Sequence, residues 1–331
     1  MFGYVVRRII SGILVLFVAS VAVFALFFYG PSDPAYAYCP ESHCTPGRLA
    51  MIRESLGLDK PVVEQYGNYM KGIFVGNDYK AGALTIPCPA PCLGVSFKLR
   101  VNVTDYLLGR FPATLSLACG SAVIFLTLGV GLGTMAARVR GTMADKGIVG
   151  SSLLLNSIPY YLLALLSYLY LVSEWGIFPE TGYHSPFTDG PLAWVKGLLL
   201  PWVVLAVWDS TQYARFSRGS MIEALNEDYV RTARAKGLSE RRVTFKHALR
   251  AAIVPVITIF GLDFAYLLAG TVFTEYIFNI QGIGLTAISA IFQKDLPIIS
   301  ATVLIAATFV VAMNLIVDVV YSVIDPRVRL S

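Results

Sequence analysis

Long apolar runs, separated by short polar stretches, extend over most of the sequence. A helix needs about 20 mainly apolar residues to cross a bilayer, because its peptide groups must be hydrogen-bonded within the helix where water is absent. Six runs qualify, and they predict six membrane-spanning helices: Ile9–Tyr29, Phe111–Ala137, Gly147–Val172, Gly197–Ala214, Ala251–Phe273 and Ile298–Tyr321. The fourth is the weakest, because it is short and contains Asp209. The pattern therefore predicts an all-α polytopic membrane protein.

The predicted spans divide the chain into three parts. Residues 1–30 hold the N-terminus and the first helix, residues 31–110 form one long loop, and residues 111–331 form a five-helix core. A polar loop at about 215–250 interrupts the core between its fourth and fifth spans. The first apolar run is too long for the hydrophobic region of a signal peptide and lacks a small-residue cleavage site, so we expect an uncleaved helix.

The long loop has helical patterns of its own. Apolar residues at spacings of three and four predict helices within Pro46–Val75, with Thr45 as the N-cap and Gly57 as a stop. A mixed polar and apolar stretch, Leu99–Leu108, is expected to lie at the membrane interface as a helix. Phe111-Pro112 would then turn the chain into the bilayer.

The composition supports a membrane protein. Hydrophobic residues make up 56% of the chain and charged residues 14%, against about 25% charged in an ordinary globular domain. The mean hydropathy is +0.65, so too little charge is available to cover two soluble domains. These values exclude a DNA-binding protein, a small secreted disulfide protein and a disordered regulator.

The distribution of basic residues predicts the orientation. Sixteen of the 26 Lys and Arg residues lie at the two ends and in the loops near 138–146 and 215–250, whereas the short loops near 173–196 and 274–297 hold one each. Basic residues in short loops mark the cytoplasmic side, and long loops cross largely regardless of charge. Both termini are therefore expected in the cytoplasm, and residues 31–110 outside.

Four of the five cysteines lie in the predicted external loop, where the surroundings are oxidising: Cys39, Cys44, Cys88 and Cys92. Two disulfides are expected, and four cysteines allow three connectivities. Pairing of close neighbours is simplest because nearby prolines favour tight turns. Pairing across the loop stays open, as does a metal site that adds His43, although the spacings fit zinc only loosely.

The 215–250 loop is too polar for the bilayer but rich in helix-forming residues. Gly237 can take the left-handed conformation that ends a helix, and Ser239 can cap the next one, so the sequence predicts helix, glycine turn, helix. The simplest alternative is a basic loop that only fixes topology. Acidic residues mixed with the basic ones argue against that alternative, and small residues at Ala233 and Ala235 would let another protein approach closely.

This loop resembles the cytoplasmic loop of the dipeptide and oligopeptide permease subunits of bacterial ATP-binding-cassette (ABC) importers, in the run EALNEDYVRTARAKGLSERRVTFKHALRAAIVPVI. The resemblance extends to RRIISGILVLFVASVAVFAL, LGLDKPVVEQYGNYMKGIFVGNDY, RFPATLSLACGSAVIFLTLGVGLG, TEYIFNIQGIG and VDVVYSVIDPRVR, and thus covers nearly the whole chain. The wider superfamily has Glu-Ala-Ala where this chain has Arg231-Thr232-Ala233, and Gly237 is retained. The peptide-permease branch shows the same departure.

The resemblance implies a transport function. The chain would pair with a second homologous permease subunit, and the two would surround a path for peptide cargo in the bacterial inner membrane. Two ATPase subunits would bind ATP and Mg, and an external solute-binding protein would deliver the cargo; no nucleic acid is involved. The chain itself has no phosphate-binding loop, no set of catalytic residues and no expected cofactor or metal, so it is not expected to be an enzyme.

The resemblance also implies site residues. Contact with the ATPases is assigned to the following positions of the 215–250 loop: Glu223, Asp228, Tyr229, Arg231, Ala233, Arg234, Ala235, Lys236 and Gly237. Asp209 and Asp263 lie within predicted spans, where a charged residue often marks a transport path. They could instead be structural, bonded to Gln212 or Tyr266.

Other functions remain open at this point. Relatives with the same machinery carry nickel, glutathione or haem-like cargo, which the permease sequence separates poorly from peptides. A receptor or scaffold without transport would need no ATPase subunits. A secondary transporter would need inverted repeats and broken helices at the ion site, and neither is evident.

Overall fold

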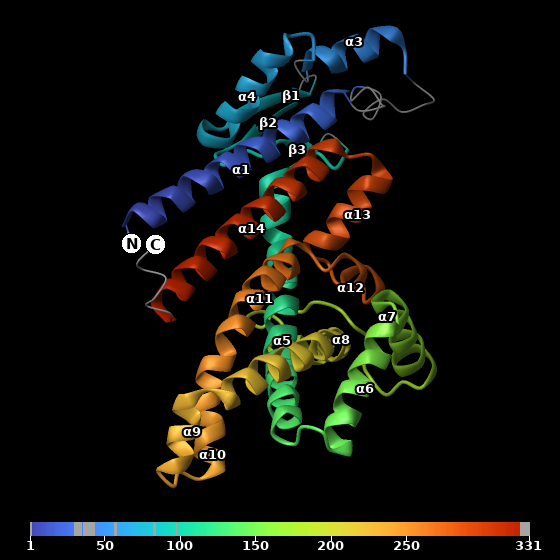
Figure 1. Ribbon diagram of the computed structural model, residues 1–331. Helices are drawn as coiled ribbons and strands as arrows, with labels where there is room; N and C mark the ends of the chain where they lie inside the picture. The colour runs from blue at the N-terminus through green and yellow to red at the C-terminus, as the bar shows by residue number, and fades with distance from the viewer. Residues whose placement is uncertain are drawn as a thin grey trace. The chain divides into compact units, whose positions relative to one another are not determined.

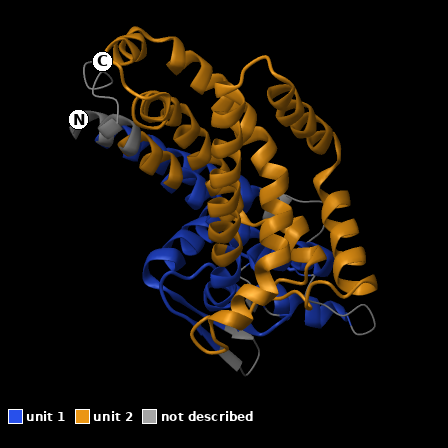
Figure 2. Cartoon of the chain, turned by 90° about the horizontal axis from the view of Figure 1, so that it is seen from below, with its two compact units in different colours: residues 1–114, 281–312 blue, residues 115–280, 313–331 orange. Residues whose placement is uncertain are grey.

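The computed structural model describes residues 2–29, 35, 44–55, 58–81, 84–96 and 98–324 (Figure 1). Helices account for most of the described chain, which confirms the predicted all-α class. The chain forms two compact units, residues 1–114 with 281–312 and residues 115–280 with 313–331 (Figure 2). Each unit is described in turn.

Within the described residues, five helices are long and apolar enough to cross a membrane: α1 (Phe2–Tyr29), α5 (Val103–Arg138), α8 (Pro191–Asn226), the stretch Glu240–Ala269 that ends in α11 (Leu249–Ala269), and α14 (Leu296–Ile324). A sixth crossing is possible if one bent pair of helices forms a single span. The protein is therefore a multi-pass membrane protein, as the apolar runs predict.

The bent pair replaces the straight third span that the sequence predicts. It consists of α6 (Met143–Ser157) and α7 (Tyr160–Tyr168) with its π-helical continuation η2 (Leu169–Glu174), at an angle of 87°. The break lies at Ile158-Pro159. Ile158 takes an extended conformation, with φ −86° and ψ 126°, because a residue before proline is disfavoured in the helical region.

The start of α5 also differs from the prediction. The helix begins at Val103 and runs through Pro112 without a break, so no separate interfacial helix covers residues 99–108. Asn102 explains the start, because its side-chain oxygen accepts the backbone N–H of Thr104 at 2.8 Å, as an N-cap does. Pro112 interrupts the hydrogen bonding of the helix without ending it, as membrane helices often tolerate.

Besides α1 and the start of α5, the first unit contains the 31–110 loop. The helices of this loop are α3 (Pro46–Ser55) and α4 (Val62–Val75), and its two small sheets are a hairpin of β1 (Asn77–Ala81) with β2 (Leu84–Cys88) and a pair of β3 (Val95–Ser96) with β4 (Val101–Asn102). The helix α13 (Ile283–Gln293) and the first part of α14 complete the unit. Thr45 accepts the N–H of Arg48 at 3.4 Å, consistent with its predicted capping role, whereas Gly57 lies outside the described residues.

The sheets were not predicted, because their strands are two to five residues long and lie among Pro and Gly. The hairpin pairs Asn77 with Cys88 at its open end. This register brings the first residue of β1 next to the cysteine-containing turn.

The second unit is built around α5 and α8. A Cβ atom at Gly129 or Gly133 would overlap the backbone or side chains of α8, so glycine allows the two helices to approach closely. The remaining elements are α6, α7, α9 (Asp228–Ala235), α10 (Glu240–Arg242), the π-helical η3 (Val243–Ala248), α11 and α12 (Val272–Ile277). The close packing of α8 against α5 holds the end of α8, from which the 215–250 loop begins.

Candidate functional site

The 215–250 loop is a compact continuation of two long helices. The helix α8 extends to Asn226, α9 follows after a single residue, and α10 and η3 lead into α11. The predicted arrangement of helix, glycine turn and helix is present. Within the second unit, Figure 1 shows α9 and α10 beyond the last turns of α8.

A glycine turn ends α9. Gly237 has a φ of +73°, and its N–H donates to the carbonyl oxygen of Arg234 at 2.9 Å. The N–H of Leu238 reaches the carbonyl oxygen of Ala233 at 3.3 Å, which completes the hydrogen-bond pattern of a Schellman motif. Leu238 also packs against the cluster of buried residues to which Ala233 belongs. The direction of the chain after α9 is therefore fixed by backbone bonds and by an apolar contact.

One face of α9 is buried within the chain. Val230 is fully buried and Ala233 is 5% exposed. They share a cluster with residues of α5, α8, η3 and α11: Ala137, Met221, Ala224, Val243, Ala248 and Ala252. This corrects the expectation that Ala233 is a contact surface for another protein, because its methyl group packs inside the protein itself. The small side chain serves to seat α9 against its own neighbours.

Arg234 is also engaged within the loop. Its Nε donates to Oε1 of Glu240 at 2.8 Å and its Nη2 to Oε2 at 3.4 Å, while Nη1 approaches the carbonyl oxygen of Leu225 at 3.5 Å. The side chain thus joins α9 to α10 and to the end of α8. Because it is 41% exposed, the pair with Glu240 is worth at most about 1 kcal/mol, and its main effect is on geometry.

The other face of α9 is exposed and charged. The sequence-predicted residues Asp228, Tyr229, Arg231, Ala235 and Lys236 are all exposed, and Arg231 makes only a weak contact of 3.3 Å with Asp228. Partial burial, followed by the charge of Glu227, raises the pKa of Tyr229, so its hydroxyl stays protonated at neutral pH. This surface can offer hydrogen-bond donors and two positive charges to a partner.

Glu223 is exposed in the last turn of α8, and Gly237 is exposed in the turn. The structure thus places every predicted residue of the loop on its surface except Ala233. Sequence reasoning missed this distinction, although the spacing of three between Val230 and Ala233 marks one face of the helix.

An ion pair near the loop was also missed. Nε of Arg218, on α8, donates to Oδ1 of Asp145 at 2.6 Å, and Nη2 donates to Oδ2 at 2.8 Å. Asp145 is buried and accepts the N–H of Gly141 at 2.9 Å, while Thr142 caps the N-terminus of α6. The signal was Thr142-x-x-Asp145 before an apolar run, the pattern of a capping box. The pair holds the turn between α5 and α6 against α8.

Asp209 and Asp263 lie on α8 and α11 of the second unit. The hydroxyl of Tyr213, one turn from Asp209, donates to Oδ2 of Asp263 at 2.8 Å. For Asp263, the hydrogen-bond partner is therefore Tyr213 of α8. The hydrogen bond between Tyr213 and Asp263 connects α8 with α11, and both helices continue into the 215–250 loop.

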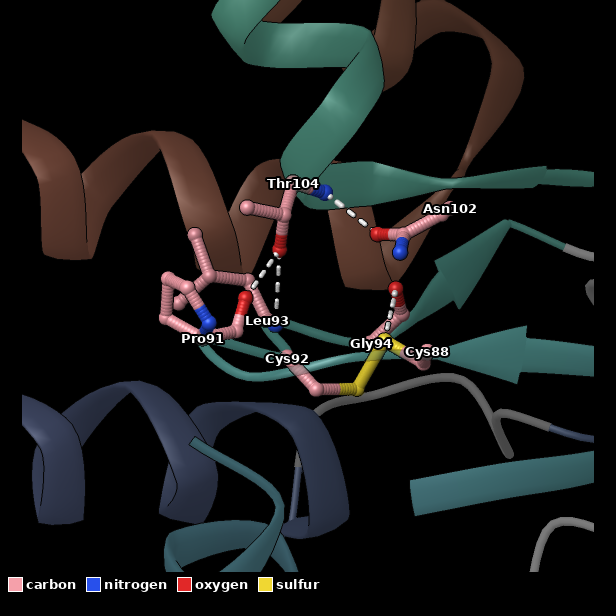
Figure 3. Close-up of a disulfide and its surroundings, with 7 residues drawn as sticks. All are labelled: Cys88, Pro91, Cys92, Leu93, Gly94, Asn102 and Thr104. Atoms are coloured by element: carbon pink, nitrogen blue, oxygen red, sulfur yellow. Dashed lines mark hydrogen bonds between the residues drawn. A yellow bond between two sulfur atoms is a disulfide. The ribbon is translucent and has the colours of Figure 1, made fainter. Parts of the chain in front are cut away.

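The cysteines of the long loop form disulfides between close neighbours where the structure describes both partners. Cys88 and Cys92 are joined, which confirms the predicted local pairing and excludes their pairing across the loop (Figure 3). Cys44 is also disulfide-bonded, whereas Cys39 and His43 lie outside the described residues. In the described part of the chain, no three His, Cys, Asp or Glu side chains converge as metal ligands.

Hydrogen bonds attach the disulfide turn to its surroundings. The hydroxyl of Thr104 donates to the carbonyl oxygen of Pro91 at 2.6 Å and accepts the N–H of Leu93 at 3.1 Å (Figure 3). The N–H of Cys92 donates to the carbonyl oxygen of Gly72 at 3.3 Å. The turn therefore connects α4 with the beginning of α5.

Two family profiles match the chain, and together they cover most of its length. The profile of the family described as binding-protein-dependent transport system inner membrane component matches residues 129–330, and that of the N-terminal region of such membrane components matches residues 1–118. The chain is 35% identical to a putative peptide transport system permease protein of Brucella abortus, 36% to the di/tripeptide transport system permease of Pseudomonas aeruginosa and 34% to the dipeptide transport system permease of Escherichia coli K12. Each match covers 99% of both chains.

Proposed function

The chain belongs to the inner-membrane components of binding-protein-dependent transport systems, and from this premise we propose that it is the permease subunit of an ABC importer for dipeptides and oligopeptides. The cargo is supported by the relatives, whose names specify peptide, di/tripeptide or dipeptide transport along almost their whole length. The chain forms half of the path, and a second homologous permease subunit forms the other half.

The observation that carries the mechanism is the structure of α9. One face of the helix is anchored by Val230 and Ala233, and the other face is exposed and charged. A helix with this division can be held by a partner on one side and pass force to its own protein on the other. We assign the exposed face to contact with the two ATPase subunits, which bind ATP and Mg.

Force on α9 is passed to the spans through stiff connections. The Gly237 turn, the buried cluster and the pair of Arg218 with Asp145 hold the loop to α5, α6, α8 and α11. When ATP draws the ATPases together, α9 and the equivalent helix of the second permease subunit move with them. As a result, α8 and α11 reorient. The path then alternates between inward-open and outward-open states, whose populations are set by the nucleotide-bound partners.

Asp209 and Asp263 are the candidates for residues that line the path. They lie on the two helices that move with the loop, and their carboxyl groups suit the ammonium group of a peptide. The hydrogen bond from Tyr213 to Asp263 would keep α8 and α11 together as they move.

The same proposal sets the location of each part. The protein lies in the bacterial inner membrane with both termini in the cytoplasm, as the basic residues of the loops indicate. Residues 31–110 lie outside, where an external solute-binding protein delivers the peptide, and the disulfide in this segment suits an oxidising compartment. Residues 111–331 form the permease core.

Reconstitution tests the function. The chain, its partner permease and both ATPases are placed in liposomes, and uptake of a labelled dipeptide is measured with ATP and with the external binding protein. Uptake is expected only when all components and ATP are present. Uptake by this chain alone, or import of nickel but not of peptides by the full assembly, would reject the proposal.

A further inference from the structure

The helix that leads from the 215–250 loop into the membrane is basic on one side. It is a single stretch, Glu240–Ala269, in which α10 and η3 continue into α11 (Figure 1). Exposed basic side chains occur at i, i+1, i+5 and i+9, namely Arg241, Arg242, Lys246 and Arg250, which we call the basic stripe. Residues four apart share a face of an α-helix, and the wider turns of η3 also bring residues five apart together. The basic stripe therefore follows one side of the helix.

The opposite side of the same helix is buried in the loop. Its buried residues are Val243, Thr244, Ala248 and Ala252. They repeat the spacing of the basic stripe two residues later in the sequence, which is about half a helical turn. The basic stripe therefore points away from the buried cluster that holds α9.

The chain does not neutralise the positive charges of the basic stripe. Three other arginines of the loop are paired with acidic side chains, at 2.6–3.3 Å. By contrast, no acidic side chain among the described residues forms an ion pair with the stripe. The sequence has no Asp or Glu between Arg241 and Leu262. Four positive charges are therefore available to an anionic partner.

Arg250 marks the point at which the helix enters the apolar region. It is followed by twelve residues without a charged side chain, Ala251–Leu262. At about 1.5 Å per residue, Lys246 lies about 6 Å before Arg250, and Arg242 about 12 Å before it. A bilayer about 40–45 Å thick with a hydrocarbon core of about 30 Å has about 5–7 Å of headgroup region on each side. Arg250 and Lys246 are therefore at the level of the headgroups, and the long side chains of Arg241 and Arg242 can reach it.

Phe245 adds an apolar group at the same level. Its side chain is 50% exposed, and it precedes Lys246 in the sequence. It also lies one turn from Arg241 and Arg242, because residues three and four apart are neighbours on a helix surface. Aromatic and basic side chains occur together where a helix meets both acyl chains and headgroups.

The balance of charge distinguishes this surface from the face of α9 that we assign to the ATPases. Residues 223–240, which include α9, contain four acidic and three basic residues. Residues 241–250 contain four Lys and Arg residues and no acidic one. A surface of mixed charge suits a folded protein partner. A cluster of four or more Lys and Arg residues directly beside a membrane span is typical of binding to anionic lipids.

We propose that the basic stripe and Phe245 bind the phosphate headgroups of anionic phospholipids, in the leaflet that faces the ATPases. The four cationic side chains neutralise the headgroups, and Phe245 lies at their boundary with the acyl chains. The bound lipids would hold the start of α11 at the membrane surface while α9 moves with its partner. This lipid partner goes beyond peptide import, and the proposed function enters only in the choice of leaflet.

Photolabelling of the unsubstituted chain tests the proposal. The full-length protein is placed in phosphatidylcholine vesicles with a small fraction of photoreactive phosphatidylglycerol or photoreactive phosphatidylcholine, each carrying the reactive group near its phosphate. Labelled segments are identified by mass spectrometry after digestion. Phosphatidylglycerol is expected to label residues 241–250 several-fold more than phosphatidylcholine, and unlabelled phosphatidylglycerol should compete. The same preference is expected in the assembled importer.

Two matched variants locate the binding surface. Lys246→Gln with Arg250→Gln removes two charges from the basic stripe, and Arg231→Gln with Lys236→Gln removes two from the exposed face of α9. With equal amounts of inserted protein, labelling by phosphatidylglycerol should fall several-fold in the first variant and stay unchanged in the second. The measurement on the unsubstituted chain decides the proposal even where the first variant fails to insert.

Three results would overturn the proposal. Equal labelling of residues 241–250 by the two lipids would mean that the basic stripe is solvated and serves only to fix topology. An equal loss of labelling in both variants would mean that the total charge of the loop attracts the lipid. Loss of labelling when the ATPases are added would mean that a protein covers the stripe. The readout needs neither peptide nor ATP, so its failure is distinguishable from a failure of the proposed function.

Discussion

At Gly237 the backbone has a φ of +73°, a region that costs an L-residue about 1–2 kcal/mol. Apart from its chain neighbours, no residue has an atom within 4 Å of the place where a Cβ would be, so the requirement for glycine is conformational and not steric. The residue matters because the two hydrogen bonds that end α9 depend on this turn. Its effect on transport can therefore be separated from any effect on packing.

Gly237→Val is expected to reduce ATP-dependent dipeptide uptake severely, because a β-branched residue disfavours the left-handed turn and the direction of the loop is lost. Gly237→Asn should keep most of the activity, because asparagine tolerates this conformation. Uptake is measured in proteoliposomes, with membrane insertion and the amount of protein matched. Equal uptake by both variants and the unsubstituted protein would contradict a role for the turn in coupling.

At the scale of one element, α9 shows how a short helix gains a fixed position. A helix of eight residues is unstable in isolation, because it forms too few hydrogen bonds to offset the free-energy cost of nucleating a helix. Burial of Val230 and Ala233 among residues of four other elements supplies the missing stability. The exposed charges are then held in place without contributing to the fold.

Reversal of charge on this face should weaken binding of the ATPases. In the double variant Arg231→Glu with Lys236→Glu, copurification of the ATPase subunits is expected to fall, and uptake with it, while the thermal midpoint of the permease stays nearly unchanged. Exposed charges contribute little to folding, which is why stability should be retained. Arg48→Glu, on α3 of the 31–110 loop, is the matched control and should leave copurification intact. Full retention of the ATPases by the double variant would disprove the assignment of this face.

The element scale also explains the broken third span. The apolar pattern of Gly147–Val172 predicts one helix, and the composition of α6 and α7 agrees with it. The direction of the chain is changed by Pro159 acting on Ile158, and hydropathy averages do not contain that information. A proline at the middle of an apolar run therefore needs to be weighed separately from the run itself.

At the scale of the whole molecule, the chain combines apolar spans with a loop that carries its own folded structure. In the 31–110 loop, the disulfide between Cys88 and Cys92 lies in a small buried cluster with Ile86 and Val95. Its turn is bonded to Gly72 of α4 and to Thr104 of α5, so one covalent link orders two helices.

Replacement of Cys88 and Cys92 by serine is expected to destabilise this loop by about 2 kcal/mol, the chain-entropy estimate for a short closed ring. The change should appear as a lower thermal midpoint and faster proteolysis within residues 58–96, measured without reductant so that the disulfide of Cys44 is retained. Cys119→Ser, which removes the free thiol of α5, is the control and should leave both measurements unchanged. A double serine variant with unchanged stability and proteolysis would show that hydrogen bonds alone order the turn.

Sequence alone determined the features that depend on local composition. The apolar runs predicted a multi-pass helical protein, Gly237 predicted a left-handed turn, and the nearby cysteines predicted a local disulfide. These predictions succeed because each depends on a few neighbouring residues and on the solvent around them.

Tertiary structure decided which side of each element is used. It buried Ala233 that sequence placed at a partner surface, joined Arg218 to Asp145, and bonded Asp263 to Tyr213. Residues far apart in sequence meet in each case, and a pattern within one segment cannot specify which distant segment will pack against it. The sequence therefore determined which segments form helices and which of them lie in the membrane. The packing between elements determined which surfaces are available for function.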